Sequence, residues 1–206
     1  MNNIVLSIGR QFGSGGGEVG KKLANELNIA YYDKELLAIA AQESGLCPEI
    51  FEKADEQESS GLSYAFSLGF SPLGMYIPHD DILSNEKLFL LQSETIRNLA
   101  AKESCVIIGR CSDYILRDNP NCLSFFIHNT FDNRVKHIIE REKVSETRAK
   151  ELITKADKSR AAYYNYYTNK LWGIASSYNF SLDVSILGID GTVTFLKDFV
   201  TRKFKQ

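Results

Sequence analysis

A glycine-rich segment directly after a short apolar run is the feature that most constrains the fold of this chain. Residues 4–8 read Ile-Val-Leu-Ser-Ile, and residues 9–20 contain six glycines. Val19, Leu23 and Leu27 then follow at four-residue spacing, which indicates a helix. The segment therefore predicts a strand, a loop and a helix. A glycine-rich loop at the start of a helix offers backbone N–H groups to an anion.

The rest of the chain alternates between strand-like and helix-like segments. Apolar and β-branched runs predict four more strands, at residues 29–32, 105–109, 122–127 and 182–187. Periodic apolar residues predict helices at residues 34–45, 88–99, 130–139, 145–167 and 193–200, with Thr130 and Ser145 as N-caps. The alternation predicts an α/β three-layer sandwich with a parallel sheet of about five strands.

Composition bounds the class of protein. The 206 residues are 44% apolar and 24% charged, which suits one globular domain over residues 1–206. The net charge of −2 leaves no basic surplus, so we expect neither nucleic-acid binding nor attachment to a membrane. Because no run of about 18 apolar residues occurs and the first apolar run is too short for a signal peptide, a cytoplasmic location is expected. The four cysteines form no CxxC pair, which predicts buried thiols of a reducing compartment. We predict no metal site, because His79, Asp80 and Asp81 have no further ligand at a suitable spacing.

The glycine loop is a degenerate match to the phosphate-binding pattern GxxxxGK[ST]. The predicted helix aligns Arg10 with the first glycine of the pattern and Gly16 with its lysine. Gly17 and Glu18 then stand where hydroxyl groups are expected. The residues predicted to bind a nucleotide cofactor are Gly13, Ser14, Gly15, Gly16, Gly17 and Glu18.

Other interpretations of the loop remain open. Gly15 to Gly20 also satisfies GxGxxG, and Asp33 follows at the end of the second predicted strand, as an NAD-binding fold requires. The five residues 10–14 count against that match, because a dinucleotide turn is tight. Gly15 to Lys21 fits GxxxxGK, but Lys21 should lie inside the helix. A glycine-rich turn without any ligand is the third alternative.

Several segments together resemble the cytidylate kinase-like family, a branch of the nucleoside monophosphate kinases in the P-loop superfamily. They are residues 7–16, 31–36, 106–110, 163–168, 172–173 and 187–190. The resemblance implies a nucleotide-phosphate fold with a core, an acceptor-binding arm at about residues 46–84 and a lid at about residues 141–169. It also implies ATP and Mg²⁺ as cofactors, with CMP or another small molecule as acceptor.

The chain departs from the family pattern at three places. Where cytidylate kinases read Asp-Gly-Arg-Asp, this chain reads Ile108-Gly109-Arg110-Cys111, so only Arg110 is carried over. The lid pattern Asp-x-x-Arg is matched by Asp157 and Arg160, but Ile153 replaces a further lid arginine. Gly16 replaces the lysine, as is common in this branch.

Two candidate site residues follow predicted strands. Arg110 ends the strand at residues 105–109 and either clasps a phosphate or pairs with Asp113. Asp33 either orients an acceptor hydroxyl and receives its proton, or caps a helix that starts at Lys34.

The long helix at residues 145–167 carries the candidate lid residues. Arg148, Lys155 and Arg160 form a cationic surface that closes over phosphates, or else a solvated face of internal pairs such as Asp157 with Arg160. Three tyrosines at helical spacing on this helix indicate core packing, with stacking on a base as the alternative. They are Tyr163, Tyr166 and Tyr167.

These features predict an ATP-dependent kinase with Arg10, Asp33, Arg110 and Arg160 as catalytic residues. Arg10 is the nearest replacement for the missing lysine, so Arg10→Ala should weaken nucleotide binding and Gly16→Lys should partly restore it. An anion is expected over the amides of residues 13–17, and the lid helix is expected to move on ligand binding. A nucleotide-binding regulator without turnover is the alternative function and an NAD-linked enzyme the third. Residues 59–84, rich in Gly, Ser, Phe, Tyr and Pro, are expected to contact the acceptor or to form a homodimer interface.

Overall fold

The computed structural model describes residues 3–33 and 85–204. The expected helix at residues 34–45, the acceptor arm, Cys47 and the cluster around His79 lie outside these residues. The chain divides into two compact units, one of residues 1–33 and 99–206 and the other of residues 34–98. Helix α5 (Asn85–Lys102) runs from the second unit into the first. All features below belong to the first unit.

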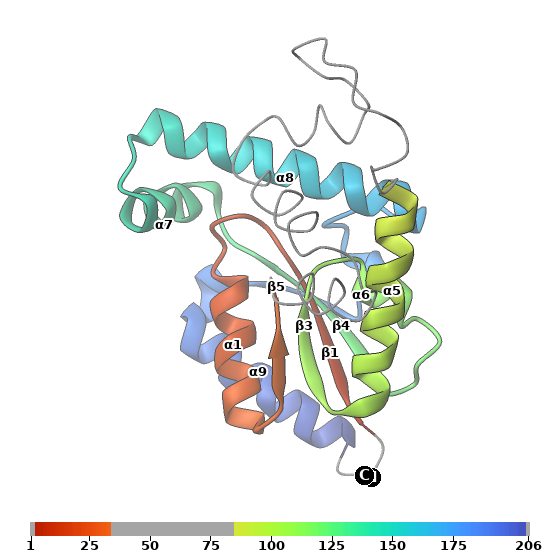
Figure 1. Ribbon diagram of the computed structural model, residues 1–206. Coiled ribbons are helices and arrows are strands. Elements are labelled where there is room, and N and C mark those ends of the chain that lie inside the picture. Colours follow the sequence, from red (N-terminus) through yellow and green to blue (C-terminus); the bar gives the residue numbers. More distant parts are fainter. Residues whose placement is uncertain (1–2, 34–84, 205–206) are drawn as a thin grey trace, which may run out of the picture. The chain divides into compact units, whose positions relative to one another are not determined.

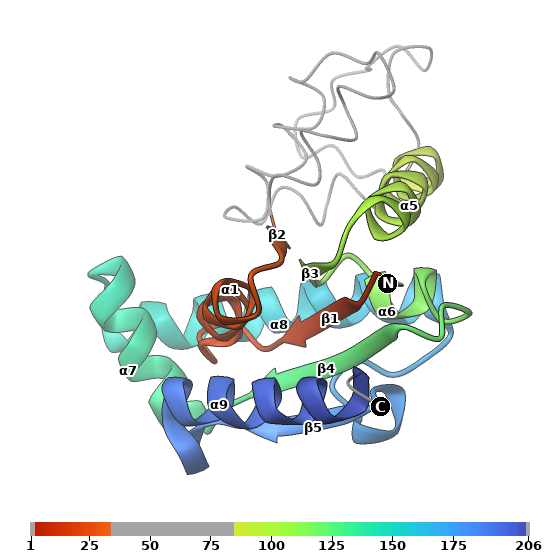
Figure 2. The same cartoon turned by 90° about the horizontal axis from the view of Figure 1, so that it is seen from below.

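The first unit is built on a five-stranded sheet. Its strands are β1 (Val5–Arg10), β2 (Ala30–Tyr32), β3 (Cys105–Ile108), β4 (Cys122–His128) and β5 (Phe180–Asp183). They lie in the order β2-β3-β1-β4-β5, and every pair is parallel. Figure 2 shows β1 between β3 and β4. The predicted α/β fold with a parallel sheet is confirmed, and all five strands end at the same edge.

Helices α1 (Gly16–Leu27) and α9 (Val184–Phe204) pack on one face of the sheet (Figure 1). Val19 and Leu23 of α1 meet Leu6 and Ile8 of β1 in a fully buried core. Gly20 lets α1 approach the sheet closely, because a Cβ there would lie 2.6 Å from Cδ1 of Ile108. Burial of this apolar layer fixes where α1 begins, and hence the position of the loop that precedes it.

Three further helices follow β3 and β4. They are α6 (Ser112–Ile115), α7 (Phe131–Glu142) and α8 (Glu146–Thr168), and a 3₁₀ turn (Ala175–Ser177) follows them. The predicted N-caps are confirmed. The Thr130 hydroxyl accepts from the Asn133 amide, and the Ser145 hydroxyl accepts from the Arg148 amide, with a donor–acceptor distance of 3.3 Å in both cases. Figure 1 shows α8 running across the end of the sheet at which β1 ends.

The predicted strand at residues 182–187 is wrong in its second half. Strand β5 ends at Asp183, and α9 begins at Val184. The Asp183 carboxylate accepts from the Ser185 amide at 2.8 Å, which caps the new helix and lowers the pKa of that carboxyl. Ile186 and Leu187 are apolar, yet 76% and 51% exposed, so apolar content alone misassigned them to the sheet.

The described cysteines agree with the prediction of buried thiols. Cys105 and Cys111 are buried, Cys122 is half-buried, and all three are free. Burial raises the pKa of Cys105 and of Cys122 to about 12, so neither thiol ionises near neutral pH. Among the described residues, no helix has the length and apolar character needed to cross a membrane.

Candidate functional site

The loop between β1 and α1 spans residues 11–15 and is held in a closed turn by Ser14. Gly13 and Gly15 adopt positive φ angles of 78° and 85°, which favour glycine. The buried Ser14 hydroxyl donates to the Gln11 carbonyl at 2.9 Å and accepts from the Gly16 amide at 3.2 Å. The Ser14 side chain, predicted to bind a cofactor, therefore shapes the loop.

Alternate amides of this loop are left for a ligand. The Ser14 amide donates to Gln11, and the Phe12 amide donates to a carboxylate of α8. Four other amides have no acceptor within the described part of the chain. They belong to Gly13, Gly15, Gly17 and Glu18. They lie at and just before the N-terminus of α1, where the helix dipole is positive, so they are donors suited to an anion.

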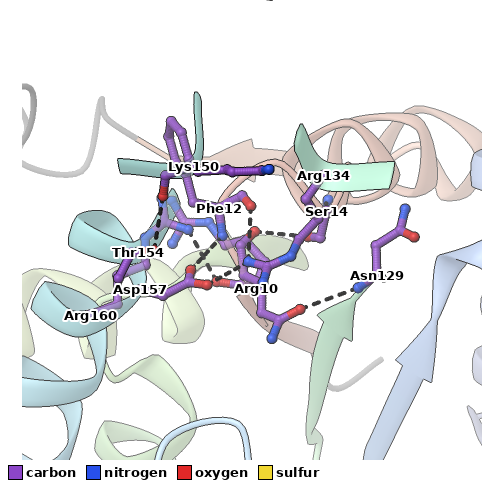
Figure 3. A network of polar contacts seen from close by, with 11 residues as sticks. Arg10, Phe12, Ser14, Asn129, Arg134, Lys150, Thr154, Asp157 and Arg160 are labelled. Atoms are coloured by element: carbon purple, nitrogen blue, oxygen red, sulfur yellow. Dashed lines mark hydrogen bonds and ion pairs between the residues drawn. The ribbon is translucent and has the colours of Figure 1, made fainter. Parts of the chain in front are cut away.

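Side chains of α7 and α8 form hydrogen bonds with the backbone of this loop and of Arg10 before it (Figure 3). Asp157 of α8 accepts from the Phe12 amide at 2.8 Å and also pairs with Arg134 of α7. The same arginine donates to the Phe12 carbonyl at 3.3 Å, and its side chain is only 8% exposed. Farther along α8, Arg160 donates to the Arg10 carbonyl at 3.1 Å.

This arrangement changes the interpretation of the long helix. Sequence spacing suggested an internal pair of Asp157 with Arg160, but the ion-pair partner of Asp157 is Arg134. Arg134 was missed, because its position on a polar helix gives no sign that its guanidinium is buried. Its Nε is buried without a hydrogen-bond partner in the described structure. Asp157 and Arg160, predicted as lid and catalytic residues, lie beside the loop and contact its backbone.

The other predicted lid cations lie on the outer surface of α8. Arg148 is exposed and pairs with Glu151 at 3.0 Å, as the solvated-face interpretation expects. Lys155 is also exposed. At the start of α1, the Glu18 carboxylate pairs with Lys22 at 3.3 Å. The structure therefore gives these three predicted residues surface positions and gathers other cations at the loop.

The tyrosines of α8 differ from the prediction of core packing. Tyr166 is 68% exposed, and Tyr163 packs on Tyr167 with ring centroids 4.7 Å apart. The buried ring is Tyr164, whose hydroxyl donates to Asp113 at 2.6 Å. This contact joins the end of α8 to α6.

The turn after β3 carries Arg110 in an unusual backbone conformation. Gly109, Arg110 and Cys111 have successive φ angles of 70°, 57° and 55°. Left-handed residues other than glycine cost roughly 1–2 kcal/mol each, so the surrounding structure must impose the turn. Asp113 follows in α6, and burial raises the pKa of its carboxyl while the Tyr164 hydroxyl opposes that rise.

Asp33 directly follows β2 and lies beside Arg10. Its carboxylate forms an ion pair with Arg10, with 3.5 Å between Oδ1 and Nη2. It also accepts from the Tyr31 hydroxyl at 3.5 Å, and that hydroxyl lies 3.3 Å from the Gly17 carbonyl. The ends of β1, β2 and β3 thus bring Arg10, Asp33 and the turn of Arg110 to one edge of the sheet. Ligands of open parallel sheets bind at this edge.

The chain matches known proteins over nearly its whole length. The model of the cytidylate kinase-like family matches residues 5–186. The chain belongs to the cytidylate kinase-like family. A comparison with curated proteins gives no match.

Solved structures share the fold of this chain. An uncharacterized protein from Eubacterium ventriosum ATCC 27560 is 30% identical, with a TM-score of 0.71, and the alignment covers 96% of this chain and 98% of that one. Shikimate kinase from Bacteroides thetaiotaomicron is 12% identical, with a TM-score of 0.55 and the same coverage. Shikimate kinase from Acinetobacter baumannii, in complex with shikimate, is 11% identical with a TM-score of 0.51, and the alignment covers 98% and 96% of the chains. At such low identity the two kinases show the fold, which is that of P-loop kinases.

The loop of residues 11–15 lies between β1 and α1, which is where the sequence predicted a phosphate-binding loop. The family is a kinase-like one, and the fold is one that a shikimate kinase shares. Gly16, which the sequence pattern aligns with the lysine of GxxxxGK[ST], is the first residue of α1. The Ser14 hydroxyl is engaged within the loop, because it donates to the Gln11 carbonyl and accepts from the Gly16 amide. No group of three or more metal-ligating side chains gathers within the described residues.

Proposed function

We propose that this protein transfers a phosphoryl group from ATP to a small acceptor, with CMP as the first candidate. The observation that carries the proposal is a set of four amides, in the loop and in the first turn of α1, that have no acceptor among the described residues, together with Arg10 and Asp33 nearby. Backbone amides at a helix N-terminus suit the phosphates of a nucleotide. Phosphoryl transfer requires mainly in-line positioning and cations around the transferred group, with little covalent chemistry from the protein.

Each side of the site would take one substrate. The amides of Gly13, Gly15 and Gly17 would hold the phosphates of the donor. Arg110, at the end of β3, would hold the anionic group of the acceptor, and Asp33 would orient the acceptor hydroxyl and receive its proton. Membership of the family supports a nucleotide as acceptor, while the fold shared with shikimate kinases makes a small hydroxy acid the next candidate.

The donor in this proposal is the magnesium complex of ATP, with the ion as part of the substrate. Gly17 has no side chain, and the Ser14 hydroxyl is used within the loop, so these residues do not fit a magnesium ion held by the loop. Magnesium binds with several waters and with substrate phosphates, so it can accompany the nucleotide. We derive no step of the transfer from it.

A direct test measures ADP formation from ATP with each nucleoside monophosphate and with shikimate as acceptors. Calorimetric titration with ATP and ADP accompanies it. We expect nucleotide binding and acceptor-dependent turnover. Turnover without an acceptor preference would leave the substrate class open to a wider panel, whereas the absence of nucleotide binding would contradict the proposal.

A regulator that binds nucleotides without turnover is the second candidate, and the glycine at position 16 favours it. Binding of ATP without ADP formation on any acceptor would establish this function. An NAD-linked enzyme is less compatible with the loop, because α1 already begins at Gly16 and most of the GxGxxG match lies inside the helix. Titration with NAD in the same instrument tests this alternative.

A further inference from the structure

The space around Gly16 is closed by the side chain of Arg10. A Cβ atom on Gly16 would lie 2.5 Å from the Cβ of Arg10 and 3.1 Å from the Cβ of Ile127. Both atoms are attached directly to the backbones of adjacent paired strands, so neither can swing away as the end of a flexible side chain would. Side chains at positions 10 and 16 therefore exclude each other.

The Arg10 side chain then extends from β1 toward the ends of β3 and β2. Its Nη1 fills the space beside Gly109, where an added Cβ would collide with it. Its Nη2 lies 3.5 Å from Asp33 Oδ1, and the side chain is only 20% exposed. The guanidinium is thus placed at the ends of β3 and β2, although its Cα belongs to β1.

Two glycines make this path possible. Gly16 gives clearance to the aliphatic stem of Arg10, and Gly109 gives clearance to its head group. In the pattern GxxxxGK[ST], the first position is glycine and the sixth following residue is lysine. This chain has the two in reverse, with a long cation at position 10 and glycine at position 16.

We propose that Arg10 supplies the cation of this phosphate loop from the opposite side, and that its ligand is the terminal phosphate of a nucleoside triphosphate where that phosphate faces the acceptor. This inference rests on the proposed function. Gly16 is then the steric counterpart of Arg10, so a lysine at position 16 cannot be restored while residue 10 keeps a Cβ. We therefore no longer expect Gly16→Lys to rescue Arg10→Ala, because alanine at position 10 retains the Cβ that collides with a side chain at position 16.

An arginine suits this position better than a lysine would. Its guanidinium has five N–H donors in a planar fork, so one side chain can pair with Asp33 and also donate to a phosphate oxygen. The Arg160 contact to the Arg10 carbonyl holds the backbone from which the side chain starts. Asp33 therefore acts on Arg10 as a positioning residue in addition to its proposed contact with the acceptor.

The steric part is tested by stability alone. We expect Gly16→Ala to lower Tm by roughly 5 °C or more in the wild type, since overpacking against a strand is costly. In the Arg10→Gly background the same substitution should lower Tm by much less. Gly17→Ala is the matched control, because among the described residues a Cβ there meets only the Tyr31 hydroxyl at 4.0 Å, and its Tm should not fall. Equal losses from Gly16→Ala in both backgrounds would overturn the exclusion.

The chemical part is tested by exchanging the two residues. We expect Arg10→Gly to weaken ADP binding less than it lowers turnover, with turnover falling at least about tenfold, because the guanidinium faces the transferred phosphate. The exchanged variant Arg10→Gly/Gly16→Lys should regain at least about tenfold over Arg10→Gly, whereas Gly16→Lys alone should not fold as the wild type does. Arg10→Lys should retain more turnover than Arg10→Gly.

The outcomes separate the two proposals. Wild-type protein that binds neither ATP nor ADP would overturn the proposed function and this inference with it. Wild-type protein that turns over, together with an Arg10→Gly variant that does so equally well, would overturn this inference alone. Failure of the exchanged variant to exceed Arg10→Gly, when its Tm matches the wild type, would also contradict it.

Discussion

At the scale of single residues, the half-buried carboxyl of Asp113 shows how the surroundings change the pKa of a side chain. Burial raises its pKa, and the hydrogen bond from the Tyr164 hydroxyl, at 2.6 Å, is the largest influence that lowers it. The residue lies in α6, directly after the left-handed turn that carries Arg110. The hydrogen bond of Asp113 to Tyr164 therefore joins the end of α8 to the helix that follows the turn of Arg110.

We predict that Tyr164→Phe costs about 1–3 kcal/mol of unfolding free energy, because it removes the side-chain hydrogen bond to the Asp113 carboxylate. A folded-state pKa above the unfolded value, about 3.9, makes stability greatest below that value and reduces it as pH rises through the raised pKa. Loss of the tyrosine hydroxyl raises the pKa further, so the decline should extend to higher pH. Urea unfolding across a pH series measures both effects.

Tyr166→Phe is the matched control for this prediction, since Tyr166 is on the same helix and 68% exposed. Its unfolding free energy should change by no more than about 0.5 kcal/mol, with an unaltered pH profile. A Tyr164→Phe pH profile that superimposes on that of the wild type would show that the Tyr164 hydroxyl does not influence the pKa of Asp113.

At the scale of secondary-structure elements, α7 and α8 both contact the loop of residues 11–15. Arg134 and Asp157 form an almost buried ion pair, and each also binds the backbone of Phe12. We predict that Asp157→Asn costs roughly 3–5 kcal/mol, because it leaves a buried guanidinium without its counter-charge. The double variant Arg134→Met/Asp157→Leu should recover much of this stability, since apolar replacement of a buried pair is often neutral.

Nucleotide affinity distinguishes packing from loop positioning in these variants. The double variant should still bind ADP more weakly than the wild type, because the Phe12 amide and carbonyl have lost their partners. Glu151→Gln breaks an exposed pair on the same helix and should change stability by less than about 1 kcal/mol. A stable double variant with wild-type affinity would show that the ion pair serves the helices alone.

The elements also show what periodicity can and cannot predict. The loop, the helix after it and the caps at Thr130 and Ser145 follow from local patterns, because each depends on residues within one turn. The strand assigned to residues 182–187 failed, because a run of apolar residues fits a strand and a helix start equally well. The α6 helix, only four residues long, carries no detectable period.

At the scale of the whole molecule, the parallel sheet and its ligand-binding edge were predictable, but the contacts that build the site were not. Alternating patterns imply a parallel sheet, and the sheet then implies where Arg10, Asp33 and Arg110 lie. The hydrogen bond from the Phe12 amide to the Asp157 carboxylate joins residues 145 positions apart. No local spacing shows such a contact, nor the clearance that Gly16 gives to Arg10.

The same architecture predicts two levels of stability within the first unit. Strand β1 is fully flanked by β3 and β4, and its apolar side chains are completely buried. The α7–α8 pair has a smaller apolar core of its own, formed by Val135, Ile138, Ala149 and Ile153. Elements with few buried contacts open at lower free energy than the central sheet.

We therefore predict that backbone amides of α8 exchange with deuterium faster than those of β1, and that ligand selectively slows the exchange of α8. Asp157 and Arg160 attach α8 to the loop that we propose binds the phosphates, so a bound nucleotide should stabilise the attached state. At a nucleotide concentration of 100 times Kd, the opening free energy of α8 should rise by up to about 2.7 kcal/mol if the open form does not bind. The half of α9 around Val193 and Leu196 is the internal control, because it packs in the sheet core and contacts no proposed ligand. Equal protection of α8 with and without ATP and acceptor would contradict a lid that responds to its ligand, and equal gains in α8 and α9 would indicate global stabilisation instead.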